Sequence, residues 1–230
     1  MIPVFTRFTS NKAIPANRQT SPVVGQNRDM SLNIPLAHDF VCPWCWVAVF
    51  QVEKLKREHD VEIDWRGYEL WPKELERPIS EPPRVIPSKP LIPSRLDLML
   101  ALERIELPKV ERAKGMSTHR PHLAAEFAKS KGKGEPFIIE LYRAFWERGE
   151  LIDEIEFLTR TGEHFGLNPD KMRSSIESEE FANQIVGFDA PAYKTGVFNV
   201  PTFTIVGERY AEQPYLVLEK AVAEATKVDA

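Results

Sequence analysis

The sequence has little of three features that would each point to a particular class of protein. Two cysteines among 230 residues are too few for a secreted scaffold held together by disulfides. Basic residues are not in excess: 30 Lys and Arg stand against 34 Asp and Glu, so a net charge of −4 offers no large basic surface to nucleic acid. The longest apolar runs are far shorter than the ~18 residues that a membrane-spanning helix needs. We therefore expect a cytoplasmic protein that binds neither nucleic acid nor a membrane, with its oligomeric state left open.

What is present is an ordinary globular composition, 43% hydrophobic and 28% charged. Residues 1–30 differ from the rest, because they hold three prolines, four basic residues and one acid without any helical or strand period. They lack the continuous apolar stretch of a secretory signal, and Met30 looks like a natural beginning. We expect an irregular leader over 1–30, which is either a weak organelle-targeting segment or a segment without function.

The remaining chain divides into three parts. Residues 31–75 predict a strand, a helix and a second strand, which together form a βαβ unit with parallel strands. Residues 76–190 begin as a proline-rich connector and continue with helical patterns. Residues 191–230 return to two strands and a closing helix. The predicted fold class is therefore α/β, a small sheet interrupted by an all-helical insertion.

Local signals place several helices within this insertion. Ser94 is expected to cap a helix over 94–105, and an apolar stripe predicts another helix over 135–149. Asn168 followed by Pro169 predicts a further helix start, because proline is tolerated at the first helical position. The insertion contains no cysteine and no cluster of histidines or acids. We expect it to shape a binding groove rather than to supply chemistry.

The two cysteines lie together in the motif Cys-Pro-Trp-Cys at 42–45, where a predicted strand meets a predicted helix. Pro43 suits the first helical turn, so Cys42 is expected at the cap, exposed, with Cys45 one turn inward on the same face. Unpaired N–H groups and a partial positive charge at a helix N-terminus stabilise a thiolate. Cys42 could then attack a disulfide, and Cys45 could resolve the mixed disulfide that forms.

Three simpler roles compete with this redox role. A zinc site would need a second pair of ligands, and the sequence offers no further cysteine and no nearby HxxxH motif, so we expect no metal. A structural disulfide that closes so short a loop would contribute little entropy. Two ordinary core cysteines at this spacing are the third alternative. The redox role is favoured, because a CxxC motif near a βαβ pattern is typical of thioredoxin-like proteins.

Four motifs in this order carry a family resemblance: "CPWCW", "WRGYELWP", "LYRAFWERGELID" and "GVFNVPTFTIVGERYAEQP". Over about residues 31–225 the chain resembles the DsbA-like thioredoxin-fold oxidoreductases, especially the FrnE-like branch that includes hydroxychromene-carboxylate isomerases. The resemblance implies a thioredoxin fold interrupted by the helical insertion, with Cys42 as nucleophile and Cys45 as resolving thiol. It also implies a cis peptide between Val200 and Pro201 that faces the sulfurs and offers the Val200 backbone to a bound polypeptide.

The sequence departs from the thioredoxin pattern at one position. Thioredoxins carry a buried acid six residues before the first cysteine, where this chain has Leu36, so His38 or Asp39 would have to manage protons. We assign His38, Trp44, Val200 and Pro201 as substrate-binding residues, with Trp44 exposed beside the thiols. The remaining aromatic and imidazole side chains are expected in two settings, the tryptophans in the core (Trp46, Trp65, Trp71, Trp146) and the histidines solvated on charged surfaces (His59, His119, His122, His164).

The leading functional hypothesis is a thiol–disulfide oxidoreductase or isomerase that acts on protein disulfides and thiols. It would need no cofactor, apart from glutathione as a possible co-substrate. The first rival is a glutathione-dependent isomerase or transferase of the kappa or hydroxychromene-carboxylate isomerase type. Such relatives usually carry serine in place of the first cysteine, so Cys42 argues against it. The second rival is a chaperone-like binding module whose insertion holds unfolded segments.

Overall fold

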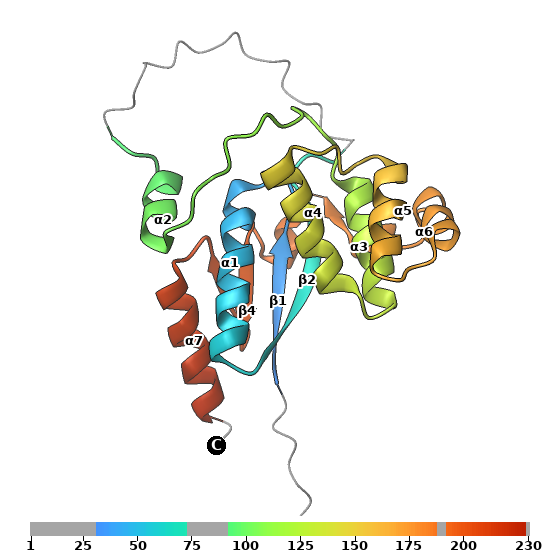
Figure 1. Cartoon of the computed structure of the whole chain (residues 1–230). Helices are drawn as coiled ribbons and strands as arrows, with labels where there is room; N and C mark the ends of the chain where they lie inside the picture. Colours follow the sequence, from blue (N-terminus) through green and yellow to red (C-terminus); the bar gives the residue numbers. More distant parts are fainter. Residues whose placement is uncertain (1–30, 73–91, 188–191, 229–230) are drawn as a thin grey trace, which may run out of the picture. The chain divides into compact units, whose positions relative to one another are not determined.

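A mixed five-stranded sheet organises the part of the chain that the computed structural model describes, residues 31–72, 92–187 and 192–228. The predicted leader over 1–30 and most of the predicted proline-rich connector lie outside the described residues. The strands follow the order β3-β2-β1-β4-β5 across the sheet (Figure 1). They are β1 (Leu32–His38), β2 (Val61–Glu69), β3 (Val186–Gly187), β4 (Thr202–Ile205) and β5 (Glu208–Ala211).

The predicted βαβ unit forms the centre of the sheet. Strands β1 and β2 pair in parallel, with Leu36 opposite Trp65, and helix α1 (Pro43–Glu58) connects them. This helix runs in front of the sheet in Figure 1, and its apolar side is buried there. Pro35 is tolerated within β1 because the antiparallel partner β4 pairs only with the two residues that follow it, Leu36 and Ala37.

The C-terminal part adds a hairpin and a helix to this unit. Strand β4 runs antiparallel to both β1 and β5. The two residues between β4 and β5, Val206 and Gly207, both have positive φ, 48° and 83°, as a tight two-residue hairpin turn requires. Helix α7 (Tyr215–Val228) lies beside α1 on the side of β4 (Figure 1). The predicted order of two strands and a closing helix is therefore confirmed.

The segment between β2 and β3 is helical, and its helix starts follow the predicted signals. Ser94 caps α2 through reciprocal hydrogen bonds with Asp97, and the side chain of Asn168 accepts a hydrogen bond from the backbone N–H of Lys171 at the start of α6. The helices in order are α2 (Arg95–Glu103), α3 (His119–Ser130), α4 (Gly134–Arg148), α5 (Ile155–His164) and α6 (Pro169–Glu177). Helix α4 lies next to α1, and α3, α5 and α6 cluster beyond it (Figure 1).

Strand β3 is an element that the sequence pattern does not predict. It falls within the stretch expected to be all-helical, and it pairs in parallel with Tyr68 and Glu69 at the end of β2. Two residues are too few to show the alternation by which a strand is recognised in a sequence. The sheet therefore gains an edge strand after the helices and before the C-terminal hairpin.

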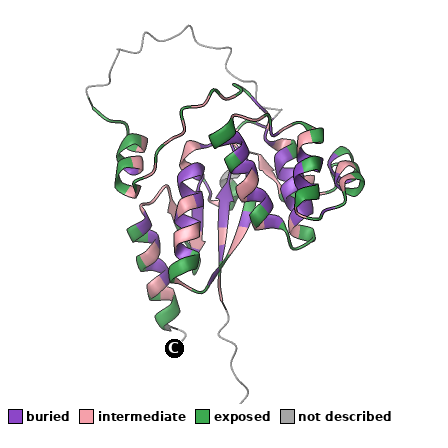
Figure 2. Ribbon diagram, viewed as in Figure 1, coloured by how far each residue is buried: buried purple, intermediate pink, exposed green. Residues whose placement is uncertain are grey.

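The core extends without a break from the sheet into the helical segment. Buried residues line β1 and the inner sides of α1 and α4, whereas α2 is mostly exposed (Figure 2). The predicted apolar stripe of α4 is buried throughout, from Ile138 and Leu141 to Phe145. Among the described residues, no helix combines the length and the apolar character that crossing a membrane demands.

Candidate active site

The first cysteine lies at the start of α1, as predicted. Cys42 is the N-cap residue, with extended backbone, and Pro43 takes the first helical position. The Cys42 carbonyl accepts hydrogen bonds from the N–H groups of Cys45 and Trp46, at 3.0 and 3.2 Å. The thiol is thus held at the positive end of a 16-residue helix, where a thiolate is stabilised.

The expectation that Cys42 is exposed is wrong, because the loop before β4 covers it. Residue Cys42 is only 6% exposed, and its sulfur donates a hydrogen bond to the carbonyl of Val200 at 3.2 Å. The peptide bond between Val200 and Pro201 is cis. The side chain of Thr202 fixes the same loop by donating to the carbonyl of Asn199 at 2.6 Å. Two segments 158 residues apart in sequence therefore meet at one sulfur.

The second cysteine lies deeper and is held differently. Cys45 is fully buried, and its sulfur accepts a hydrogen bond from the backbone N–H of Asp39 at 3.5 Å. Burial raises the pKa of the Cys45 thiol well above its ordinary value, and the neighbouring Cys42 raises it further. Both cysteines are free thiols in this structure. Cys45 is therefore protonated at neutral pH, and it must lose this proton before it can act as a nucleophile.

Behind Cys45 lies a group of four buried side chains, His38, Asp39, His122 and Tyr142, called here the polar cluster. The Tyr142 hydroxyl lies 2.9 Å from Nδ1 of His38 and donates to the backbone carbonyl of Asp39 at 3.1 Å. Nε2 of His122 lies 3.5 Å from Oδ1 of Asp39, while the other carboxylate oxygen accepts from the N–H of Leu70 at 2.8 Å. Polar groups from β1, α3 and α4 thus meet behind Cys45.

The cluster corrects the prediction for His122 and revises that for His38. His122 was expected on a charged surface, but it is 1% exposed, because α3 packs its imidazole against Phe40 and His38. His38 is equally buried, so it faces the neighbours of the thiols and not the surface that a substrate would touch. Burial lowers the pKa of His38 well below its ordinary value, and His122 and Lys129 lower it further. His38 is therefore neutral at pH 7.

Of the other three histidines, His164 is exposed as expected, whereas His59 and His119 are half-buried. His119 lies 3.0 Å from a carboxylate oxygen of Glu69, and His59 lies 3.8 Å from one of Glu219. Tyr142 itself received no role from the sequence. The available signal was its place on the buried stripe of α4, where a hydroxyl must find a partner.

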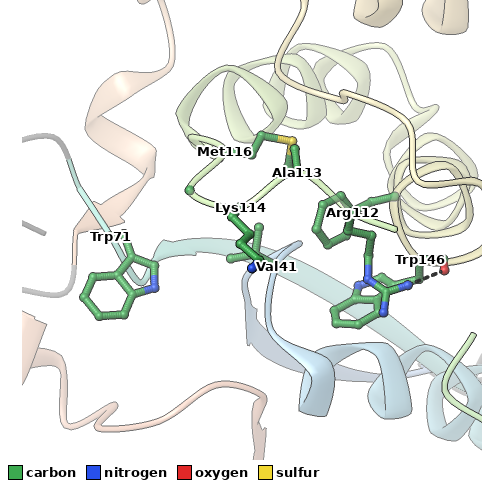
Figure 3. Close-up of a pocket in the computed structure, with 9 residues that line it drawn as sticks. Val41, Trp71, Arg112, Ala113, Lys114, Met116 and Trp146 are labelled. Atoms are coloured by element: carbon green, nitrogen blue, oxygen red, sulfur yellow. Dashed lines mark hydrogen bonds between the residues drawn. The ribbon is translucent and has the colours of Figure 1, made fainter. Parts of the chain in front are cut away.

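The surface near Cys42 carries two tryptophans that differ from expectation. Trp44 is half-buried rather than exposed, because the guanidinium of Arg95 lies 5.0 Å from the centre of its ring. Trp71 was expected in the core, but it is 48% exposed. It stands at one end of a cavity of about 510 Å³ that also contacts Val41, the residue before Cys42 (Figure 3). The other three predicted core tryptophans, Trp46, Trp65 and Trp146, are buried.

The walls of this cavity combine apolar and cationic groups. Phe145, Trp146 and Met116 supply apolar surface, and Arg112 and Lys114 supply positive charge (Figure 3). Arg112 lies over the ring of Trp146 and donates to its carbonyl at 3.0 Å, so its position is fixed. Within the described residues, no group of three or more His, Cys, Asp or Glu side chains could hold a metal ion.

Comparisons with known proteins agree with this geometry. The family model described as a DSBA-like thioredoxin domain matches residues 34–223. The uncharacterized protein YwbO of Bacillus subtilis is 28% identical over 210 residues, which is 86% of this chain and 99% of YwbO. Among solved structures, a probable DsbA oxidoreductase from Streptomyces coelicolor is similar with a TM-score of 0.61 at 21% identity, covering 84% of this chain and 89% of that chain.

Two further solved structures share the fold. A 2-hydroxychromene-2-carboxylate isomerase has a TM-score of 0.61 at 15% identity, over 86% of this chain and 98% of that chain. The cytosolic disulfide reductase DsbM from Pseudomonas aeruginosa, solved with GSH, has a TM-score of 0.57 at 16% identity over the same shares. The predicted thioredoxin fold with a helical insertion is thereby confirmed.

Proposed function

The chain belongs to the DSBA-like thioredoxin domain family of thiol oxidoreductases, and we propose that it exchanges disulfides in protein substrates through Cys42 and Cys45. One observation carries this proposal. Cys42 lies at the N-terminus of α1 with its sulfur 3.2 Å from the Val200 carbonyl, and Cys45 is one turn further along the same helix. This arrangement supports Cys42 as nucleophile, Cys45 as resolving thiol and the Val200 backbone as the edge for a bound polypeptide.

In the first step, the Cys42 thiolate attacks one sulfur of a substrate disulfide. The substrate S–S bond breaks, its second sulfur leaves as a thiolate that takes a proton from solvent, and a mixed disulfide joins Cys42 to the substrate. The hydrogen bond between Cys42 and Val200 in the free enzyme must open for this attack. The Val200 carbonyl is then available to the extended substrate chain, as in strand addition to an exposed sheet edge.

In the second step, Cys45 loses its proton and attacks the sulfur of Cys42. The bond between Cys42 and the substrate breaks, the Cys42–Cys45 disulfide forms, and the substrate leaves reduced by two electrons. The reverse sequence oxidises a substrate dithiol. The full burial of Cys45 supports this order of attack, because a substrate would meet Cys42 first.

The experiment that tests the proposal traps the mixed disulfide. Cys45→Ser keeps the nucleophile but removes the second step, so reaction with insulin should give a stable covalent adduct and nearly abolish multiple turnover. Non-reducing gels and mass spectrometry measure the adduct, and dithiothreitol should release it. The Cys42→Ser, Cys45→Ser double variant is the matched control and should form no adduct. If Cys45→Ser is alkylated at Cys42 but never joins a protein disulfide, the proposed substrate class is wrong.

A second candidate is a glutathione-using enzyme on the same site. It is favoured by the cavity beside Val41, where Arg112 and Lys114 could attract the two carboxylates of glutathione. The isomerase and the GSH-bound reductase that share the fold support the same idea. Turnover of glutathione with a small electrophile, in the absence of any reduction of insulin, would replace the first candidate with this one.

For the site of action we propose the cytoplasm. The proposal is supported by the two cysteines of the chain, which suit a reducing compartment, and by the fold shared with the cytosolic reductase DsbM. In that compartment the cycle would run toward reduction of substrate disulfides. Fractionation of the native cells, followed by detection of the chain with an antibody, tests the location.

A further inference from the structure

In the second step of the proposed reaction Cys45 must lose its proton, and the buried acid that accepts it in the thioredoxin pattern is missing here. Cys45 is fully buried and its pKa is raised by that burial, so a neighbouring group must take its proton as it attacks. Leu36, at the position of the thioredoxin acid, is apolar and fully buried, so it cannot accept a proton. The acceptor must come from another part of the fold.

The hydroxyl of Tyr142 and the Cys45 thiol both contact the backbone of Asp39: the hydroxyl donates to its carbonyl at 3.1 Å, and the Cys45 sulfur accepts from its N–H at 3.5 Å. Burial raises the pKa of Tyr142 well above its ordinary value, and the neighbouring Cys45 raises it further. On its other side it lies 2.9 Å from Nδ1 of His38. The ring of Tyr142 is fully buried against Phe40 and His38, so the hydroxyl cannot swing toward solvent. A single hydroxyl thus lies near Cys45 on one side and contacts an imidazole on the other.

Asp39 is the rival acceptor, and its geometry argues against it. Its backbone carbonyl, and not its carboxylate, contacts the Tyr142 hydroxyl, and a carbonyl does not take up a proton. The carboxylate points elsewhere, with one oxygen bound by the N–H of Leu70 and the other facing His122. His38 is therefore the base that the hydroxyl can reach.

We propose that Tyr142, supplied by the helical insertion, passes the proton of Cys45 to His38 during the second step. The inference rests on the proposed dithiol exchange. As the Cys45 sulfur attacks Cys42, its proton moves to the Tyr142 oxygen, and the tyrosine's own proton moves to Nδ1 of His38, which becomes an imidazolium. For this transfer the hydroxyl rotates away from the Asp39 carbonyl. The neutral His38 carries its proton on Nε2, so that Nδ1 is free to accept. When the disulfide is next reduced, the same protons return.

The electrostatic surroundings of His38 come from every element packed against it. Helix α3 contributes His122 and Lys129, β2 contributes the uncharged Trp65, and α4 contributes Tyr142. Asp39 directly follows His38 in the chain, and Cys42 and Cys45 of α1 lie near the Tyr142 hydroxyl. Burial, His122 and Lys129 lower the pKa of His38, so it is neutral before the step and able to accept a proton. The carboxyl group of the adjacent residue, Asp39, is the acidic group closest in sequence to the transient imidazolium.

Tyr142→Phe tests the relay, because it removes the hydroxyl and keeps the ring. An aromatic disulfide such as dipyridyl disulfide serves as the probe, since each of the two steps releases one thiol that absorbs light. We expect the first release to change less than twofold and the second to slow about 100-fold, the lower end of general acid–base catalysis. The second release should also become steeply faster with rising pH, because Cys45 must then give its proton to hydroxide.

Tyr215→Phe is the matched control. The Tyr215 hydroxyl is also hydrogen-bonded, to Glu58 at 2.6 Å, but it lies at the opposite end of α1 from the cysteines. This variant should leave both releases unchanged. Equal slowing of both releases by Tyr142→Phe, or slowing of neither, would overturn the relay, because the hydroxyl would then support the site only in general or not at all.

Two further measurements keep the inference testable if Tyr142→Phe does not fold. His38→Gln should slow the second release selectively in the same way, and the wild-type protein should show a solvent deuterium isotope effect on the second release alone. Absence of both overturns the relay. The small probe separates this outcome from failure of the proposed function. If the protein releases both thiols of dipyridyl disulfide but never reduces insulin, the relay stands and the proposed class of protein substrates is wrong.

Discussion

The surroundings of Cys42 and Cys45 differ sharply, although the two thiols lie one turn apart on the same helix. Cys42 faces the loop before β4, where the Val200 carbonyl accepts its hydrogen bond and Trp44 lies close to the surface. Cys45 faces the interior, where the polar cluster meets it from β1, α3 and α4. Cys42 therefore lies closer to the surface, as the proposed attack on a substrate needs, and Cys45 is enclosed by Cys42 and the polar cluster.

This difference assigns separate tasks to the two parts of the fold. The thioredoxin part supplies the helix N-terminus and the Val200 loop beside Cys42, where we propose that a substrate is attacked. The helical insertion supplies His122 and Tyr142, both of which contact Asp39 in the polar cluster behind Cys45. The expectation that the insertion only shapes a groove is therefore replaced by one in which it also contributes polar groups beside Cys45.

The largest expected contrast is in the alkylation of the two thiols. Iodoacetamide at pH 7 should label Cys42 about 100 times faster than Cys45, because the pKa of Cys45 is raised and its sulfur is fully buried. Peptide mass spectrometry of briefly labelled, reduced protein measures the ratio. In guanidinium chloride, as the control, the two thiols should react at similar rates. Equal labelling of both cysteines in the native protein would contradict the difference in reactivity inferred for the two thiols.

The next contrast concerns stability, and it probes the interior side of the dithiol. Since the pKa of His38 is lowered in the folded protein, the unfolded chain binds a proton below about pH 6.5 that the folded chain does not. This contribution to stability is complete above pH 6.5 and is lost as the pH falls toward the folded pKa, by about 1.4 kcal/mol per pH unit for one proton.

His38→Gln should flatten this dependence. Urea unfolding at pH 7 and at pH 5.5 gives the two free energies of unfolding for the wild type and the variant. The exposed His164 provides the matched control, because His164→Gln should keep the wild-type slope. An unchanged slope in His38→Gln would show that the imidazole titrates freely, and it would remove the neutral base from the polar cluster.

The two sides of the dithiol also differ in how far the sequence predicts them. The place of Cys42 follows from a local signal, since Pro43 fixes the helix start, whereas the loop at Val200 and Pro201 that faces it was implied by the family resemblance. The starts of α2 and α6 were predicted for the same reason, because a cap depends on residues only three positions apart. These elements required no knowledge of the tertiary structure.

The polar cluster could not be predicted in this way. His122 looks like a surface residue in a stretch with charged neighbours, and it becomes buried only through the packing of α3 against β1 and α4. Tyr142 reaches Asp39 across 103 residues of sequence. The prediction for Trp71 was wrong in the opposite direction. Its apolar bulk suggested a core position, but in the fold it lies exposed at the edge of a cavity. Such placements depend on long-range packing, which no local pattern encodes.

The smallest expected effect lies on the substrate side of Cys42. Trp44 is half-buried beside the thiol under the guanidinium of Arg95, so it offers an aromatic surface to a bound polypeptide. Trp44→Ala should raise the KM for reduction of insulin about two- to tenfold, since an aromatic contact contributes on the order of 1 kcal/mol. Alkylation of Cys42 should change little, because neither the cap nor the Val200 contact involves this ring. Leu216→Ala, which alters an exposed apolar residue on α7, is the control and should leave KM unchanged. A fall in the alkylation rate of Cys42 as large as the rise in KM would mean that Trp44 affects the reactivity of the thiol and not only the binding of substrate.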